Sequence, residues 1–259
     1  MKQYKFNKEK HLHTLDGIPL TGTSSVVGVL MKPLSWWASG KAVELLGWLN
    51  PKKHTEEERK DSSSLMREKI WSMSEEEYLK LLDNAYKNHA TSLKKSASKG
   101  TDLHAELEDF VKGKMGIKDV REYNERIQPF IKWSEENVKT FIASEANCYS
   151  EKLWVGGVID VIAEMEDGTL AIIDFKSSRE VYPSQLLQAS GYAIQADENG
   201  LFSEDGEHTK KLDKPIEKII VVPFGAEVVV PEVRININDY KKGFESAVNL
   251  YRLLGLEKN

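Results

Sequence analysis

Residues 154–176 read Trp-Val-Gly-Gly-Val-Ile-Asp-Val-Ile-Ala-Glu-Met-Glu-Asp-Gly-Thr-Leu-Ala-Ile-Ile-Asp-Phe-Lys. Two apolar runs rich in Val and Ile flank an Asp-Gly pair, and this pattern is typical of a β-hairpin. Three charged residues stand within the runs: Asp160, Asp174 and Lys176. The expected fold and the candidate chemistry both depend on how this hairpin places them.

The length of the hairpin loop decides whether these charges can meet. A two-residue loop would put Asp160 and Asp174 on opposite faces of the sheet. A three-residue loop over residues 166–168, with Gly168 left-handed as a bulge, would pair the two aspartates directly. Lys176 would then share their face, because side chains alternate along a strand. Only the three-residue loop creates a site.

Two directly paired aspartates need a positive partner. Their Cβ atoms would be only ~5 Å apart, and their carboxylates would repel each other. A divalent cation such as Mg²⁺ removes that repulsion, and a neighbouring lysine can hold water or stabilise charge on phosphate. The alternative is a half-exposed hairpin whose charges are solvated. Because Asp160 and Asp174 interrupt runs with a buried pattern, their charges need partners, which favours the site.

Length and composition narrow the class of protein. The chain has 259 residues, of which 40% are hydrophobic and 30% charged, so we expect one substantial core with an elaborated N-terminal part. No apolar run approaches the ~20 residues that span a bilayer, and the polar N-terminus has no apolar segment after it. We therefore expect a soluble, cytoplasmic protein without membrane partners, in the host cytoplasm if a phage encodes it.

Charge, cysteine content and the lack of a phosphate-binding loop argue against several other classes of protein. The net charge of -5 gives no global signal for nucleic-acid binding, so local patches must carry any such binding. The single cysteine, Cys148, cannot form an internal disulfide or support a cysteine-rich metal site. No phosphate-cradling G-x-x-x-x-G-K-[ST] loop occurs, so nucleotide hydrolysis is not indicated.

Polar candidates also occur in three segments outside the hairpin. His104 and Glu108 are four residues apart beside an apolar helical stripe, where a histidine is more often a hydrogen-bonded core residue than a ligand. Glu145 lies on the strand before the hairpin, and we favour a salt bridge over metal ligation for it. Gln188 and Tyr192 lie on one polar face of a helix that begins near Pro183, and this face could be an ordinary solvent face or a substrate contact.

Two features of the first hundred residues bear on nucleic-acid binding. The only sizeable basic run spans residues 87–100 and includes Lys94, Lys95 and Lys99 without an acidic residue. Such a run would attract a phosphate backbone in a salt-sensitive manner. The pair Trp36-Trp37 could stack on bases of a single strand, but we favour a role in packing the helix that it opens.

The order of these motifs resembles that of the PD-(D/E)XK nuclease superfamily. Within it, the chain is similar to the branch that contains RecB nuclease domains, the mitochondrial genome maintenance exonuclease and phage-encoded exonucleases. The resemblance covers about residues 99–223, and the Thr-Ser-Ser-Val and Trp-Trp-Ala region also looks like the start of such phage proteins. It is carried by Gly100-Thr101, His104, Gly157, Asp160, Asp174-Phe175-Lys176, Gln188 and Tyr192.

The resemblance implies a role for each motif residue. Asp160, Asp174, His104 and the backbone carbonyl of Phe175 would hold one or two Mg²⁺ or Mn²⁺ ions, and Lys176 would handle the attacking water. The helix glutamate of the family could be Glu108 or Glu145, and both stay open. Gln188 and Tyr192 would lie against the substrate, together with Lys94, Lys95 and Lys99. Some relatives hold an iron-sulfur cluster with four cysteines, and we expect none here.

The resemblance also implies a fold and a domain division. We expect an α/β restriction-endonuclease-like core of element order αβββαβ, with a mixed central sheet flanked by helices. Residues 1–98 would form a mainly helical N-terminal region packed on the core. Residues 99–259 would form the core, with a C-terminal strand and helix.

The implied activity is hydrolysis of phosphodiester bonds in DNA. We expect an exonuclease that acts on strand ends or single strands in recombination, repair or replication, with DNA as partner and either a second copy or a phage or host recombination protein as a further one. One alternative is a non-catalytic nucleic-acid-binding or recombination accessory protein on a nuclease fold. Another is a structure-specific endonuclease.

Overall fold

The computed structural model describes residues 3–30, 35–119, 122–225 and 231–256, apart from the side chains of residues 93–101. The chain forms two compact units. The first unit contains residues 1–31 and 100–259, and the second contains residues 32–99. This division differs from the expected regions 1–98 and 99–259, because residues 1–31 group with the larger unit. Among the described residues, no helix is both long and apolar enough to cross a membrane.

The hairpin of strands β6 (Val155–Met165) and β7 (Leu170–Lys176) has the three-residue loop. Met165 N donates to Thr169 O at 2.9 Å, and Gly168 N donates to Met165 O at 2.9 Å. Gly168 has φ 81°, the left-handed conformation that glycine adopts without strain. The register pairs Val161 with Ile173, and one residue further along both strands Asp160 stands opposite Asp174. Of the two loops considered from the sequence, the structure therefore has the one that brings the two aspartates together.

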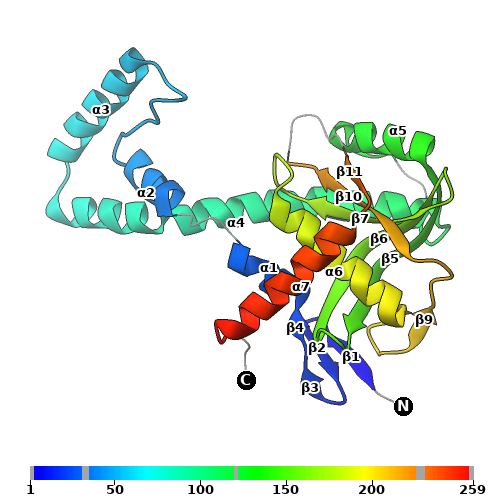
Figure 1. Cartoon of the computed structure of the whole chain (residues 1–259). Coiled ribbons are helices and arrows are strands. Elements are labelled where there is room, and N and C mark those ends of the chain that lie inside the picture. Colours follow the sequence, from blue (N-terminus) through cyan, green and yellow to red (C-terminus); the bar gives the residue numbers. More distant parts are fainter. Residues whose placement is uncertain (1–2, 31–34, 120–121, 226–230, 257–259) are drawn as a thin grey trace. The chain divides into compact units, whose positions relative to one another are not determined.

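The hairpin forms the centre of an eight-stranded mixed sheet in the first unit (Figure 1). Strands β5, β6 and β7 are antiparallel neighbours, whereas β7 and β10 are parallel. The short β4 (Thr21–Gly22) pairs with β6 off the main path. In spatial order the path runs β11 (Glu232–Ile235), β10 (Ile216–Pro223), β7, β6, β5 (Val138–Ser150), β8 (Leu201–Phe202) and β9 (His208–Lys210).

Helices cover both faces of this sheet, so the chain is an α/β protein. One core cluster joins the sheet to α4 (Glu75–Lys114) and α5 (Gln128–Asn137), through residues such as Leu107 and Phe130. A short 3-10 turn, η2 (Glu125–Ile127), precedes α5. A second cluster joins the sheet to α6 (Pro183–Asn199), and a third joins α6 to α7 (Asn238–Leu253). Figure 1 shows α6 and α7 lying across one face of the sheet.

The N-terminal residues of the first unit are strands rather than helices. β1 (Tyr4–Asn7), β2 (Leu12–Leu15) and β3 (Ile18–Pro19) form a small antiparallel sheet. After β4, a short helix α1 (Thr23–Val27) and a 3-10 turn η1 (Gly28–Leu30) follow. The backbone pairing of β4 with β6 ties this segment to the central hairpin.

The second unit is helical, as expected for most of the N-terminal region. It contains α2 (Ser35–Glu44), α3 (Glu56–Trp71) and the first part of α4. A capping box between Thr55 and Glu58 starts α3, and reciprocal bonds between Ser74 and Glu77 start α4. Neither α2 nor α3 buries a residue, and Trp36 is 89% exposed. The packing role favoured for Trp36 is therefore wrong.

Candidate metal centre

Three acidic residues form a row across three neighbouring strands. Asp174 is on β7, Asp160 is on β6, and Glu145 is on β5. The pairs Ser144–Val161 and Ala146–Ile159 flank the position where Glu145 stands opposite Asp160. Glu145 has φ 52°, a conformation that non-glycine residues adopt rarely, so the strand is locally distorted at this residue. The sheet itself thus brings the three carboxylates together.

His104 joins the row from helix α4. Its Nε2 atom lies 3.8 Å from Glu145 Oε1 and 3.9 Å from Asp160 Oδ1. One ligand atom from each of these three residues fits within 4.8 Å of the others. The imidazole ring packs edge-on against Phe175 and Phe224, with centroid distances of 5.7 Å and 6.1 Å. These aromatic contacts fix the orientation of the ring toward the carboxylates.

Asp174 and Lys176 form a buried ion pair beside this group. The Asp174 side chain is only 1% exposed, and its Oδ1 accepts a hydrogen bond from Lys176 Nζ at 3.0 Å. Oδ2 lies 2.8 Å from the same nitrogen, but no donor is aligned with it for a hydrogen bond. Phe175 N donates to Asp160 Oδ2 at 2.7 Å, which connects the two strands through the aspartate side chain.

Burial and neighbouring charges shift the protonation of the site. Burial raises the pKa of Asp174 to about 6, although the Lys176 ammonium opposes the shift. Burial, and then the charge of Asp160, raise the pKa of Glu145 to about 7. Burial also raises the pKa of Asp160 and lowers the pKa of His104, which favours a neutral imidazole. For Lys176 burial lowers the pKa, but the two aspartates outweigh it, so its pKa is raised and it stays an ammonium.

The residues present fit a divalent cation. Of the three carboxylates, Asp174 is held directly by the Lys176 ammonium, while burial and repulsion by neighbouring carboxylates raise the pKa of all three, so the ionised group carries uncompensated negative charge in a poorly solvated place. A hard cation takes carboxylate oxygens, and a neutral imidazole is a common further ligand. Asp174 Oδ2 is buried without a hydrogen bond, and a cation would satisfy it. His104, Glu145, Asp160 and Asp174 are the residues that would hold the ion.

Gln188 and Tyr192 of α6 lie on the wall of a cavity of about 1000 Å³, which His104, Glu145 and Asp160 also line. Gln188 Nε2 donates to Tyr192 Oη at 2.7 Å. Gly157 on β6 lets the tyrosine approach, because a Cβ there would lie 2.4 Å from a Tyr192 ring carbon and 2.8 Å from Thr23 Oγ1. Asp174 and Lys176 are not among the residues that line this cavity.

The two candidate glutamates, Glu145 and Glu108, have different partners in the structure. Glu145 belongs to the group that can hold a metal, and its only described ion-pair contact is with His104. Glu108 lines the cavity but forms an ion pair with Lys112 on the next turn of α4. The geometry therefore favours Glu145 as the glutamate of the metal group. Its contact with His104 is compatible both with the salt bridge favoured from sequence and with metal ligation, so the choice between these two roles stays a prediction.

Other predicted site residues are not placed by the structure. The side chains of Lys94, Lys95 and Lys99 lie outside the described residues. The Phe175 side chain is buried, and its backbone carbonyl as a ligand stays a prediction.

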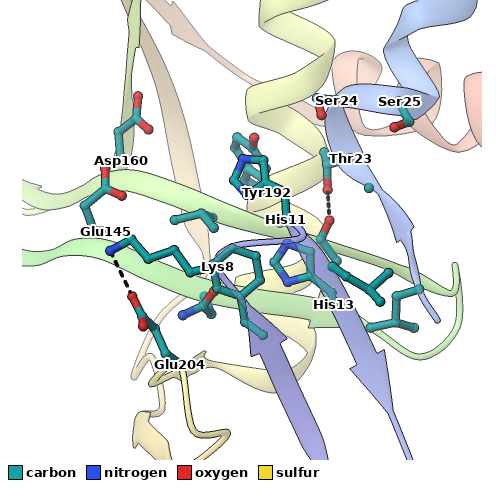
Figure 2. A pocket seen from close by; sticks show the side chains of 18 of the residues that line it. Lys8, His11, His13, Thr23, Ser24, Ser25, Glu145, Asp160, Tyr192 and Glu204 are labelled. Atoms are coloured by element: carbon teal, nitrogen blue, oxygen red, sulfur yellow. Dashed lines mark hydrogen bonds and ion pairs between the residues drawn. The ribbon is translucent and has the colours of Figure 1, made fainter. Parts of the chain in front are cut away.

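Sequence reasoning missed the cavity wall that the N-terminal segment contributes. Lys8 and His11 from the β1–β2 turn line the cavity, as do Thr23, Ser24 and Ser25 after β4 (Figure 2). The run Thr-Gly-Thr-Ser-Ser at residues 21–25, already part of the resemblance, was the signal that could have drawn attention to this segment. Comparison of the sequence with models of known protein families and with curated proteins gave no match.

Proposed function

We propose that the chain is a metal-dependent deoxyribonuclease with a PD-(D/E)XK core. The observation that carries this proposal is the row of Glu145, Asp160 and Asp174, completed by His104 and by Lys176. An acidic row with an adjacent ammonium suits a reaction in which a cation and a lysine together stabilise charge on a phosphate. The order α4, β5, β6, β7, α6, β10, which is interrupted by α5 before β5 and by the short strands β8 and β9 before β10, supports assignment of the core to this class.

The residues of the chain would divide the work of phosphodiester hydrolysis. When bound, Mg²⁺ or Mn²⁺ supplies Lewis-acid chemistry, since it neutralises phosphate charge and lowers the pKa of water. Lys176, held by Asp174, would donate a hydrogen bond to the attacking water or to a phosphate oxygen. The bond from Phe175 N would keep Asp160 oriented during the reaction. The water oxygen would attack phosphorus and release its proton to solvent, the P–O bond to the leaving sugar oxygen would break, and that oxygen would take up a proton from solvent.

The shape of the site favours action on a strand end or a single strand. The cavity of about 1000 Å³ is as large as the largest small-molecule sites, which hold up to about 1,000 Å³. A few nucleotides suit such a volume better than a continuous duplex does. Gln188 and Tyr192, on the wall of the cavity, would contact a base or a sugar of the bound strand.

Cleavage of end-labelled DNA tests the proposal. Single-stranded and duplex substrates, linear and circular, would be incubated with Mg²⁺, Mn²⁺ or EDTA. We expect metal-dependent shortening of linear strands, and a loss of at least ~100-fold in Asp174→Asn and Lys176→Ala. Glu166→Gln is the matched control, because it neutralises an exposed carboxylate in the loop of the same hairpin.

Each other outcome points to a different function. Cleavage at the wild-type rate in both site variants would contradict the assignment. Retained DNA binding without cleavage under any metal would favour the accessory protein. Nicking of circular DNA without attack on linear ends would favour the structure-specific endonuclease.

A further inference from the structure

Basic residues of the N-terminal segment stand directly beside the acidic row. Lys8, Lys10 and His11, in the turn between β1 and β2, line the same cavity as Glu145 and Asp160. Figure 2 shows the Lys8 side chain extending toward Glu145. An anionic ligand bound near the carboxylates would therefore meet three basic side chains on the adjoining wall.

The turn that carries these residues is held in place. Lys10 N donates to Asn7 Oδ1 at 2.9 Å, and His11, with φ 49°, closes the turn. Phe6 N donates to Glu204 O at 3.1 Å, which ties β1 to the loop after β8. Because side chains alternate along a strand, Phe6 and Lys8 face the cavity, whereas Lys5 does not line it.

Lys8 is engaged by a contact that a phosphate could replace. Its Nζ atom lies 3.1 Å from Glu204 Oε1, and both side chains are mostly solvent-exposed. Exposed ion pairs contribute little to stability, so exchange of the carboxylate for another anion is easy. The Glu204 carboxylate thus marks a position that a phosphate oxygen can occupy beside Lys8.

We propose that Lys8, Lys10 and His11 form a phosphate-binding wall that holds the backbone of a single nucleic-acid strand next to the metal centre. The inference rests on the proposed function, since it deepens the same site by naming where the strand outside the scissile phosphate is held. In the absence of nucleic acid, the Glu204 carboxylate forms the ion pair with Lys8, and a phosphate of the bound strand would replace it. The wall supplies positive charge that the chain as a whole, with a net charge of -5, lacks.

Binding without cleavage tests the wall. Fluorescence anisotropy of a short labelled single-stranded oligodeoxynucleotide would be measured with the full chain in EDTA, over a series of salt concentrations. One lost phosphate contact lowers the slope of log K against log salt by ~0.7, which amounts to ~5-fold weaker binding near ~0.1 M salt. We expect this loss for Lys8→Ala and for Lys10→Ala. Lys5→Ala, on the preceding strand β1 and not lining the cavity, is the matched control and should bind as wild type does.

The outcomes separate this inference from the proposed function. If wild type cleaves DNA but Lys8→Ala and Lys10→Ala bind as tightly as Lys5→Ala, the proposed phosphate-binding role of these residues is wrong and the proposed nuclease activity is supported. If both variants weaken binding but no metal supports cleavage, the phosphate-binding role is supported and the proposed nuclease activity is wrong. Glu204→Gln should tighten binding, and unchanged or weaker binding would contradict the role given to Glu204. Circular dichroism of each variant ensures that a loss of binding is not a loss of fold.

Discussion

His13 on β2 is a buried histidine whose neighbours favour its neutral form. Its side chain is 5% exposed, and Nδ1 forms a hydrogen bond of 2.6 Å with Tyr4 Oη. The ring stacks on Phe6 with a centroid distance of 4.4 Å. Burial, with a smaller effect of His11, lowers the pKa of His13 from 6.5 to about 4. The folded state therefore favours the neutral imidazole.

The stability of the first unit should depend on pH through His13. The unfolded chain takes up a proton below the unfolded pKa of 6.5, but the folded chain does so only near pH 4, so stability falls as pH falls across this range. Between about pH 7 and about pH 5 the loss should be about 2 kcal/mol. Urea unfolding at several pH values measures it. His13→Gln should remove this part of the pH dependence, whereas His11→Gln, which changes an exposed neighbour, should retain it. If the free energy of unfolding depends on pH equally in wild type and in His13→Gln, the prediction is wrong.

Glu145 shows at the residue level how the metal centre is assembled. A left-handed backbone at a non-glycine residue costs energy, and such residues concentrate at functional sites. Here the distorted residue is the one that brings a third carboxylate to His104 and Asp160.

At the scale of elements, the contact between β6 and α6 shapes the cavity. Gly157 lies against Tyr192 and Thr23, and Gln195 Nε2 on α6 donates to Thr23 Oγ1 at 2.8 Å. Cys148 on β5 contributes to the same buried region, 3.5 Å from the Gly157 carbonyl. Strand, helix and N-terminal segment thus meet at one position that has no room for a side chain.

Gly157→Ala should disturb this junction. An added Cβ would overlap the Tyr192 ring, so the ring or the helix must move, at a cost of ~1–3 kcal/mol in the free energy of unfolding. Gly28→Ala is the matched control, because a Cβ there meets nothing within 4 Å, and its effect should stay within about 0.5 kcal/mol. Denaturant unfolding compares the two. A Gly157→Ala protein as stable as the Gly28→Ala protein would show that α6 can move away freely.

At the scale of the whole molecule, metal binding should raise thermal stability. A cation present at about 100 times its Kd stabilises the folded state by about 2.7 kcal/mol, or roughly 5–10 °C in the melting temperature of a unit this size. Differential scanning calorimetry with Mn²⁺ or with EDTA measures the shift. Because the chain has two compact units, we expect only the transition of the first unit to respond.

Two glutamine variants connect this shift to the site. Glu145→Gln should lose most of the shift, since it removes a carboxylate of the metal group, whereas Glu108→Gln should keep it. Each variant is compared with itself in EDTA, which cancels the direct effect of the substitution. A shift that survives Glu145→Gln and disappears in Glu108→Gln would reverse the assignment of the two glutamates.

The sequence alone determined the parts of the fold that depend on near neighbours along the chain. The Asp-Gly turn and the strand alternation predicted the hairpin but left its loop length open. The structure has the three-residue loop, which is the one that the metal-site hypothesis requires. The start of a helix near Pro183 was predicted in the same way from nearby residues. Turn chemistry, capping and periodicity involve residues only a few positions apart, so they can be read directly from the sequence.

Only the tertiary structure decided which distant residues share the cavity. A distorted backbone at Glu145, which the pattern of apolar residues does not predict, brings this side chain beside His104. Lys8 reaches the cavity because its segment is tied to the sheet by β4, which pairs with β6 more than a hundred positions later in the chain. The exposure of Trp36 likewise is set by how the described residues around its helix pack, and not by the sequence of the helix itself. Contacts between distant segments follow from how the sheet and its helices pack, and the local pattern of one segment carries no record of that packing.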